Sequence, residues 1–121
     1  MALPRIKQRR DFLRAARTGK RAARPGLILQ AQPVPAAGPD AAPLRVGFTV
    51  TKKVGNAVVR NRTKRRLREA ARFVLGEAPP ELLRNGGWDL VLIGRDDTRK
   101  RDFRTLMGDL RGCLKQTGVL P

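Results

Sequence analysis

Hydrophobic and polar residues alternate most clearly over the segment from Leu44 to Lys52. Successive side chains of a strand point to opposite faces of a sheet, so this period of two predicts a strand with an apolar and a polar face. The apolar face would carry Val46, Phe48 and Val50, and the polar face Arg45, Thr49 and Thr51. Gly47 lies between the polar residues, where its missing side chain would let a partner approach the sheet.

Three further segments have the character of strands. The run Trp88–Gly94 is apolar on both faces, which favours a central position in the sheet. Leu27–Gln32 and a short segment at Arg21–Ala23 predict the other two. Pro33–Pro43 contains four prolines and predicts a loose turn, and Glu77–Gly87 predicts a linker.

Apolar residues spaced three and four apart predict two amphipathic helices. The first covers Ala57–Leu75, and Asn56 is a candidate for its N-cap. Its apolar stripe consists of Val59, Thr63, Leu67, Ala70 and Val74. The second runs from Phe103 to Leu114, with Asp102 as a possible N-cap and Gly118 as the stop signal.

The pattern near the N-terminus predicts a third helix. Residues 1–5 are expected to fray, and Lys7–Thr18 to form a helix that ends at Gly19. The apolar side of this helix would carry Ile6, Leu13 and Ala16, with Phe12 at its edge.

The predicted order is helix, strand, strand, helix, strand, helix, with the extra strand at Arg21–Ala23. This order indicates an α+β fold, in which a single small sheet has helices packed against it. The length of 121 residues fits one domain over residues 1–121. The single cysteine, Cys113, excludes an intrachain disulfide and fits a small apolar residue on a helix.

The chain is expected to be cytoplasmic and to have no membrane partner. No run of the sequence approaches the roughly 20 apolar residues that a membrane helix needs. The basic N-terminal stretch also lacks the long apolar segment of a secretory signal.

The net charge of +17 is concentrated in two segments. Residues 1–24 carry nine bases and one acid, and residues 45–72 carry ten bases and one acid. The last 49 residues are nearly balanced, with eight bases and seven acids. A solvated surface of mixed sign explains the C-terminal half, whereas the two basic segments require an anionic partner.

The densest basic stretch lies on the predicted helix Ala57–Leu75. Six of the ten residues from Arg60 to Glu69 are cationic and one is acidic. Like charges this close destabilise a helix by roughly a few tenths of a kcal/mol per pair, unless a polyanion neutralises them. A binding site tolerates that cost more readily than a purely structural helix does.

The composition argues against a catalytic site made by the polypeptide alone. The chain contains no histidine, serine or tyrosine, which removes the commonest general base and the serine nucleophile. Its acids are scattered, and helix capping or charge balance explains Asp96 and Asp97 better than a metal site does. A glycine-rich phosphate loop is also missing.

Structured RNA is the partner that these patterns favour. The basic helix follows a strand and not another helix, so a helix-turn-helix for DNA is not expected, and neither is DNA binding. Aromatic residues, on which single strands usually stack, are limited to four phenylalanines and one tryptophan. Trp88, Phe73 and Phe103 are expected in the core, whereas Phe12 is the best candidate for exposure. An arginine-rich helix that contacts the backbone of a folded RNA fits best.

One long stretch resembles the signature of the bacterial ribonuclease P protein component. The stretch runs unbroken from Leu44 through Lys52-Lys53-Val54-Gly55-Asn56 to Arg60-Asn61-Arg62 and Glu69. Asp11-Phe12, Gly19 and the segment Trp88–Arg95 agree with the same family, so the resemblance covers essentially the whole chain. It implies a fold similar to ribosomal protein S5, with the order αβββαβα and a left-handed βαβ crossover.

The resemblance also implies a function. Members of the family are subunits of a ribonucleoprotein whose catalytic RNA subunit holds Mg²⁺ and removes the 5′ leader of precursor tRNA. The protein assists by binding the leader and by promoting substrate and Mg²⁺ affinity.

Site residues follow from the matching motif. The residues implied to bind RNA are Arg60, Asn61, Arg62, Lys64, Arg65, Arg68, Lys52 and Lys53. Asn61 is also the candidate Mg²⁺ contact. The implied leader cleft contains Phe12, Arg9, Arg10 and Thr49. Ala16 and Gln30 stand where many members have aromatic residues. We therefore expect leader binding here to rely less on stacking and more on Arg9, Arg10, Lys52 and Lys53.

Two alternatives remain open from the sequence. A structural ribosomal protein or a general RNA chaperone would use the same basic helix in another way. A self-sufficient metal-dependent nuclease is disfavoured because the acids are scattered.

Overall fold

The strand β4 (Trp88–Gly94) lies at the centre of the sheet, as its two apolar faces predict. In the computed structural model, which describes residues 3–34, 44–76 and 87–121, β4 pairs antiparallel with β2 (Leu27–Pro33) and parallel with β3 (Leu44–Thr49). The short strand β1 (Lys20–Arg24) pairs with β2, so the order in the sheet is β1-β2-β4-β3. The predicted turn and linker fall mainly on residues 35–43 and 77–86, outside the described residues.

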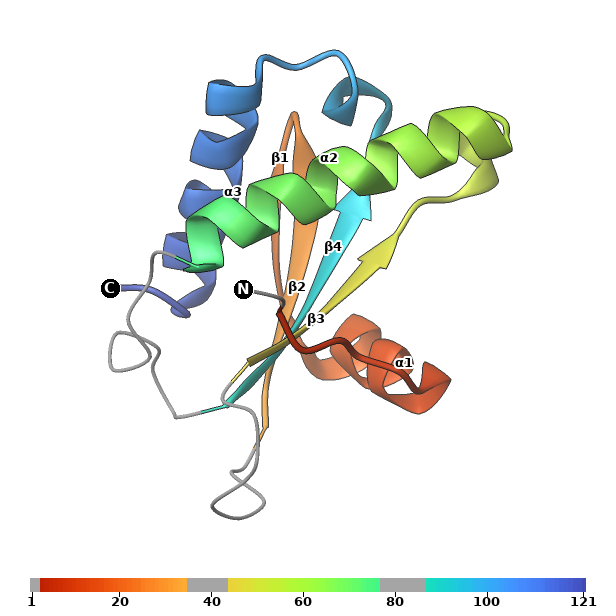
Figure 1. Cartoon of the computed structure of the whole chain (residues 1–121). Coiled ribbons are helices and arrows are strands. Elements are labelled where there is room, and N and C mark those ends of the chain that lie inside the picture. The colour runs from red at the N-terminus through yellow and green to blue at the C-terminus, as the bar shows by residue number, and fades with distance from the viewer. Residues whose placement is uncertain (1–2, 35–43, 77–86) are drawn as a thin grey trace.

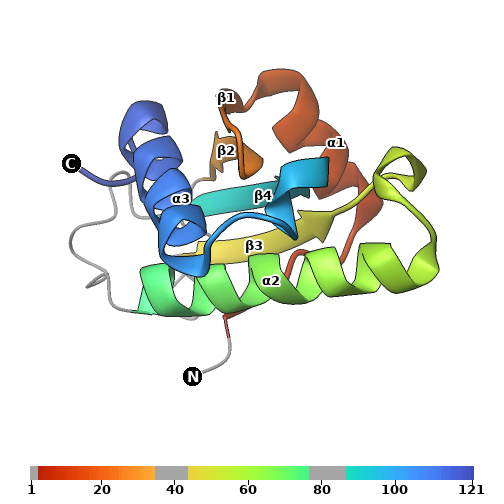
Figure 2. The same cartoon turned by 90° about the horizontal axis from the view of Figure 1, so that it is seen from above.

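The helices cover both faces of this sheet (Figures 1 and 2). On one face lies α1 (Arg9–Thr18), and on the other lie α2 (Ala57–Gly76) and α3 (Phe103–Thr117). Two short 3-10 helices, η1 (Lys52–Val54) and η3 (Asp96–Thr98), precede α2 and α3. The crossover from β3 through α2 to the parallel neighbour β4 is left-handed, against the usual rule for such units, and the α+β prediction is confirmed.

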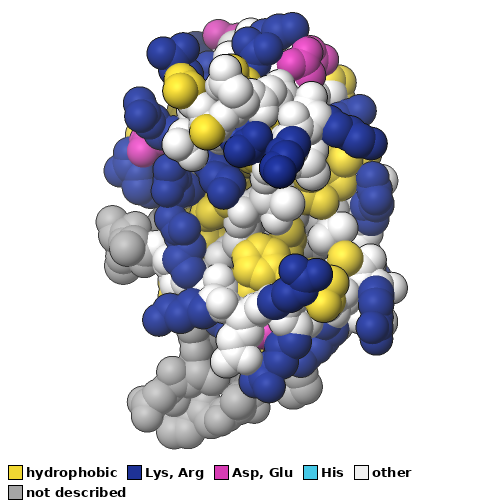
Figure 3. Space-filling view, turned by 90° about the vertical axis from the view of Figure 1, so that its right-hand side faces the viewer, with side chains coloured by type: hydrophobic (Ala, Val, Ile, Leu, Met, Phe, Trp, Pro, Cys, Tyr) yellow, Lys and Arg dark blue, Asp and Glu magenta, His cyan; other side chains and the backbone are white. Residues whose placement is uncertain are grey.

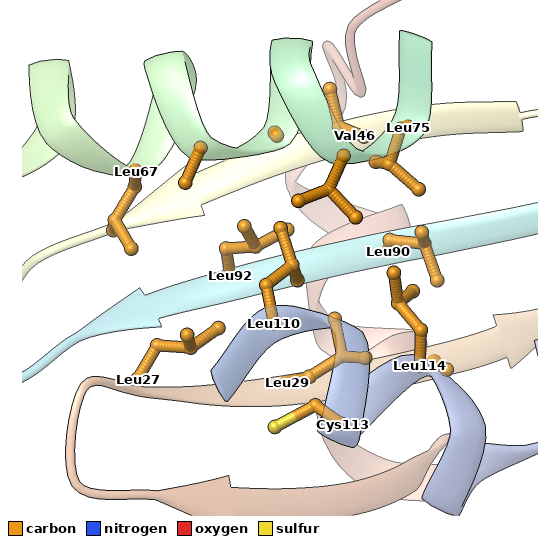
Figure 4. Packing of buried hydrophobic residues seen from close by; sticks show 14 of the residues in the cluster. Leu27, Leu29, Val46, Leu67, Leu75, Leu90, Leu92, Leu110, Cys113 and Leu114 are labelled. Carbon is orange, nitrogen blue, oxygen red and sulfur yellow. The ribbon is translucent and has the colours of Figure 1, made fainter. Parts of the chain in front are cut away.

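The main core lies between the sheet and the pair α2 and α3 (Figure 4). Alternation along β4 sends Leu90 and Leu92 into this core and leaves Val91 and Ile93 for the α1 face. Leu67 of α2 and Leu110 of α3 are fully buried against the strand residues. The predicted stripe of α2 is confirmed at its buried positions and extends to Ala71 and Leu75.

Cys113 is part of this core, as the sequence predicts. Its side chain is fully buried on α3, and burial raises the pKa of the thiol because the thiolate would lose its hydration. Among the described residues no helix is long and apolar enough to cross a membrane.

The predicted caps set the helix ends. The backbone N–H of Val59 donates to Asn56 Oδ1 at 3.0 Å, and that of Thr105 donates to Asp102 Oδ2 at 3.2 Å. Gly118 ends α3 with φ 87°, a conformation that favours glycine. Asp96 pairs with Arg99 and Lys100 on the surface, which confirms the expectation of charge balance at this acidic pair.

The predicted apolar side of α1 is wrong at Leu13 and Ala16, whereas Ile6, just before the helix, is buried as predicted. Leu13 is 45% exposed and Ala16 is exposed, whereas Asp11 and Ala15 are buried. This orientation of the helix brings the buried Asp11 carboxylate to Arg45 on the sheet, and a buried charge needs such a partner.

The expectation that residues 1–5 fray is also wrong for the part that the structure describes. Val46 donates its backbone N–H to Pro4 O, and Ile6 donates to Val46 O, both at 2.9 Å. This short pairing covers the outer edge of β3, which would otherwise present unpaired backbone groups.

The rotation of α1 predicts a contrast between two leucine-to-alanine substitutions. We expect Leu67→Ala, in the core, to lower the free energy of unfolding by about 2–5 kcal/mol, because it leaves a cavity. Leu13→Ala removes the same atoms from a side chain that is 45% exposed, so we expect a loss well below 1 kcal/mol. Urea unfolding of both variants measures this, and equal losses would show that Leu13 belongs to the core after all.

Candidate nucleic-acid interface

The packing of α2 divides its cations between two flanks. Thr63 and Leu67 are buried on the sheet, and each residue is turned about 100° from the one before it. Lys64 and Arg68 therefore lie on the flank beside β3 and α1, where they line a hollow with Phe12 and Phe48. On the other flank, Arg62, Arg65 and Arg66 line a hollow together with Arg99 from the segment that follows η3.

The first flank borders a cleft between α1, β3 and α2. Its larger part has a volume of about 520 Å³ and is open to solvent. The lining consists of Lys7, Arg9, Phe12, Leu13, Phe48, Thr49, Val50 and Lys64. A smaller hollow of about 170 Å³ adjoins it and brings in Arg5, Gly47 and Arg68. This face shows hydrophobic side chains in the centre and lysines and arginines on both sides (Figure 3).

The Phe12 ring fills the space above Gly47, which has no side chain. A Cβ atom added to Gly47 would lie 2.5 Å from Phe12 Cε1 and 2.6 Å from Phe12 Cζ, so only glycine allows the ring to pack here. The expectation that a partner approaches the sheet at Gly47 is therefore wrong, because the protein's own ring fills that space. Phe12 is half-buried, packed with Ile6 and Val91 on one side and bordering the cleft on the other.

The second ring of the cleft is Phe48, which has a cationic neighbour. The guanidinium of Arg5 lies over the Phe48 ring, 5.1 Å from its centroid. Arg5 is held there by the backbone pairing of its segment with Val46. Phe48 is half-buried and packs its other side against the main core.

A buried ion network holds α1 in place beside the cleft. Arg45 on β3 forms a two-pronged pair with Asp89 on β4, with Nε–Oδ1 at 2.9 Å and NH2–Oδ2 at 2.7 Å. The same guanidinium reaches Asp11 of α1 at 3.4 Å, and Asp11 also pairs with Arg14 at 3.4 Å. The hydrogen bond to Asp89 raises the pKa of Arg45, so this guanidinium stays charged at any physiological pH. Asp11 immediately precedes Phe12, so this network fixes where the ring lies.

Arg66 joins α2 to the segment before α3. Its guanidinium donates to the backbone oxygens of Arg99, at 3.4 Å, and of Arg101, and it lies 5.8 Å from the centroid of the Phe103 ring. This side chain is therefore structural in part, although it lies within the basic stretch.

The structure brings some of the predicted RNA-binding residues together and leaves others apart. Phe12, Arg9 and Thr49 line the cleft with Lys64. Asn61, Arg62, Arg65 and Arg68 are exposed along α2, and Lys52 and Lys53 are exposed on η1 at the entrance to α2. Arg60 is half-buried, since its NH1 donates to Gly55 O at 2.9 Å. Arg10 and Ala16 are exposed on α1, and Gln30 is half-buried on β2.

The residues that the structure describes do not fit a metal held by protein alone. Within residues 3–34, 44–76 and 87–121, no three acidic, cysteine or histidine side chains lie close enough to hold an ion. Asn61, the predicted Mg²⁺ contact, is exposed and has Arg60 and Arg62 as sequence neighbours. Mg²⁺ prefers carboxylate, phosphate and water oxygens, and the surrounding cations would repel it unless phosphates were present.

Several contributors to this surface were not predicted. Arg5 and Lys7 were assigned to a frayed or helical end, and only the pairing with β3 brings them to the cleft. Phe73 was expected in the core, but it is 44% exposed near the end of α2. Phe73 follows Arg66 by seven residues, so both side chains lie near the same side of the helix. A helical wheel therefore could have predicted that Phe73 lies beside Arg66 and away from the core.

Comparisons with known proteins agree on one family. Residues 2–118 match the family model described as Ribonuclease P. The chain is 56% identical over 115 residues to the ribonuclease P protein component of Gluconacetobacter diazotrophicus, covering 95% of this chain and 91% of that protein. It is 49% identical over 118 residues to the protein of the same name from Paramagnetospirillum magneticum, covering 98% and 85%.

Solved structures show the same fold. The RNase P protein of Staphylococcus aureus superposes with a TM-score of 0.70 at 26% identity and covers 97% of both chains. The RNase P protein of Thermotoga maritima superposes with a TM-score of 0.69 at 29% identity, covering 93% of this chain and 96% of that one.

The ion network predicts a local effect of Asp11→Ala. Removing this buried carboxylate leaves Arg45 with one partner, so we expect α1 to detach more often while the main core stays folded. Amide hydrogen exchange should become at least several-fold faster over residues 9–18 and stay unchanged over α3. Asp96→Ala, which removes an exposed carboxylate with two ion pairs, is the matched control. Unchanged exchange in α1 would contradict the role given to Asp11.

Proposed function

The chain belongs to the ribonuclease P protein family, and from this premise we propose that it is the protein subunit of a ribonucleoprotein endoribonuclease that matures precursor tRNA. In this proposal the RNA subunit carries out the hydrolysis, and the protein binds RNA on both sides of α2. Its place of action would be the cytoplasm, where tRNA is processed.

The observation that carries the proposal is the cleft beside α2. A single-stranded leader offers unstacked bases and a row of phosphates. The cleft offers two half-buried rings, Phe12 and Phe48, between Lys7 and Arg9 on one side and Lys64 on the other. Bases would contact the rings while phosphates meet the cations, and Thr49 adds a hydroxyl on the floor. Neither interaction requires a particular base, which suits a subunit that must accept many leaders.

The exposed cations along α2 would meet the RNA subunit. Asn61, Arg62 and Arg65 point away from the sheet, and Lys52 and Lys53 extend the same charge to η1. An arginine fork matches two phosphate oxygens, so a folded RNA backbone is a fitting ligand for this surface. Mg²⁺ would be held mainly by the RNA subunit, and Asn61 would approach it only with RNA phosphates in place.

A specific subunit fits the site better than a general RNA chaperone or a structural ribosomal protein does. A chaperone needs mobile, nonspecific contacts, whereas the Asp11–Arg45–Asp89 network holds the cleft in one shape. A self-sufficient nuclease would need clustered carboxylates, and the described residues contain no such cluster.

Reconstitution tests the proposal directly. Cleavage of a precursor tRNA at low Mg²⁺ is measured with the RNA subunit alone, the protein alone, and both together. We expect strong stimulation only with both, since the protein supplies substrate affinity and charge neutralisation. Failure of the protein to stimulate the RNA subunit would refute the proposal, and cleavage by the protein alone would indicate a nuclease.

The cleft predicts a selective effect of Phe12→Leu. Stacking of one base on an aromatic ring contributes about 1–3 kcal/mol, and leucine keeps only part of that contact. We expect the reconstituted enzyme to bind a leader-bearing precursor about 5- to 20-fold more weakly and mature tRNA unchanged. The control is Phe73→Leu, which alters a ring on the other flank. It should keep the wild-type ratio of the affinity for the leader-bearing precursor to the affinity for mature tRNA. Equal losses for both ligands would mean that Phe12 acts only in packing.

A further inference from the structure

The flank of α2 opposite the cleft carries a second cationic hollow. It has a volume of about 340 Å³ and is lined by Arg62, Arg65, Arg66 and Arg99. No carboxylate belongs to this lining, and neither Arg62 nor Arg65 has an ion pair among the described residues. Arg99 pairs with Asp96 at 3.3 Å, but both side chains are exposed, and such pairs contribute little. Arginines from two separate elements thus face one space without a counter-charge in its lining.

Arg66 fixes the geometry of this hollow. Two of its guanidinium nitrogens are held by the backbone oxygens of Arg99 and Arg101, so α2 and the segment after η3 keep a fixed separation. Its Nε atom is buried and has no hydrogen-bond partner among the described residues. The hollow is therefore pre-formed by the fold.

An aromatic pair, of which Phe73 is exposed and Phe103 is partly buried, continues the same flank. Phe73 is 44% exposed and meets Phe103 edge to face, with the centroids 6.0 Å apart. Arg72 lies over the Phe73 ring at 4.8 Å, and Arg66 lies over Phe103 at 5.8 Å. Phe73 follows Arg66 by two helical turns, a rise of roughly 10 Å, which lies within reach of neighbouring nucleotides of one strand.

We propose that the surface of α2 that meets the RNA subunit continues on this flank as a second site, in which Arg99 joins Arg62 and Arg65 in holding a backbone phosphate and Phe73 stacks an unpaired base of the RNA subunit. The site rests on the proposed function, because its ligand is the RNA subunit. Arg99 and Phe73 are the residues that it adds, since both lie outside the basic stretch Arg60–Glu69.

RNA explains both halves of this surface. An acidic peptide would account for the arginines but not for an exposed ring beside them, whereas a nucleotide has both a phosphate and a planar base. The leader is not the expected ligand, because a strand in the cleft would have to cross α2 to reach Arg99. The two flanks would therefore bind different RNA segments at the same time.

The test measures the affinity of the full chain for the purified RNA subunit over a series of salt concentrations. Arg99→Ala should weaken binding several-fold and reduce the slope of log K against log salt by about 0.7–0.9, because one phosphate contact is lost. Phe73→Leu should weaken binding about fivefold and leave the slope unchanged, since stacking releases no counterion. Arg21→Ala, at an exposed arginine on the far edge of the sheet, is the control and should bind as the wild type does.

A second measurement separates the two flanks. The ratio of precursor to mature tRNA affinity in the reconstituted enzyme should not change in Arg99→Ala or Phe73→Leu. The double variant Lys64→Ala/Arg68→Ala, on the cleft flank of the same helix, should lower this ratio. Thermal unfolding checks that each variant is folded, and Arg99→Lys, which keeps the charge, should restore most of the salt slope.

The outcomes distinguish the inference from the function on which it rests. If the wild type stimulates the RNA subunit but Arg99→Ala and Phe73→Leu bind it as Arg21→Ala does, the second site is wrong and the proposed function stands. A lower ratio of precursor to mature tRNA affinity in Arg99→Ala or Phe73→Leu would also overturn the second site, because these residues would then belong to the leader site. Poly-glutamate serves as a model of an acidic protein. If Arg99→Ala lost affinity for poly-glutamate but kept the wild-type affinity for the RNA subunit, the flank would bind an acidic protein and the second site would be wrong. A wild type that fails to bind the RNA subunit would remove both proposals.

Discussion

The packing of α2 on the sheet is the contact on which the rest of the molecule depends. This helix carries six cations between Arg60 and Arg68, and their mutual repulsion opposes its formation. A narrow stripe that includes Thr63, Leu67 and Ala70 is fully or almost fully buried and holds the helix against β3 and β4. Because the stripe is narrow, cations remain on both of its sides, and one helix serves two surfaces. A wider apolar face would have hidden one of them.

The cleft depends on a second contact, between α1 and the other face of the sheet. Few apolar side chains secure α1, since its buried cluster consists mainly of Ile6, Ala15 and Val91 with Phe12 at the edge. The ion network through Asp11 makes this weak apolar contact directional, because a guanidinium donates its hydrogen bonds to carboxylates mainly in its own plane. The absence of a side chain at Gly47 then determines how deeply Phe12 can sit. These polar contacts therefore determine where α1 and Phe12 lie more than they stabilise the fold.

The strands, α2, α3 and their caps follow from local patterns, and so the sequence predicts them well. Periodicity identifies Trp88–Gly94 as the central strand and Thr63 and Leu67 as buried, because each such choice depends on neighbours in the chain. The prediction of which side of α1 faces the sheet is wrong for the opposite reason. Whether Leu13 or Asp11 faces the sheet is decided by Arg45 and Asp89, which are distant in sequence, and no helical wheel contains them.

The candidate site divides in the same way. The motif on α2 and Phe12 could be identified in advance, whereas the roles of Arg5, Arg99 and Phe73 depend on tertiary contacts. Arg5 reaches Phe48 only because its segment pairs with β3, and Arg99 reaches α2 only because Arg66 binds its backbone. The sequence alone gives no reason to distinguish Arg5 or Arg99 from other charged surface residues. Their contacts with Phe48 and with Arg66 form only in the folded chain.

The distribution of charge on α2 also suits the proposed partnership with a catalytic RNA. Two RNA segments that must come close repel each other through their phosphates, and salt alone screens them only over roughly 8–10 Å. A helix with Lys64 and Arg68 on one flank and Arg62 and Arg65 on the other places fixed cations between such segments. Fixed charges need no further ordering when the second RNA arrives, so binding of one segment lowers the electrostatic cost of the other. In the proposed enzyme, the protein would thereby increase substrate affinity without contributing a reacting group.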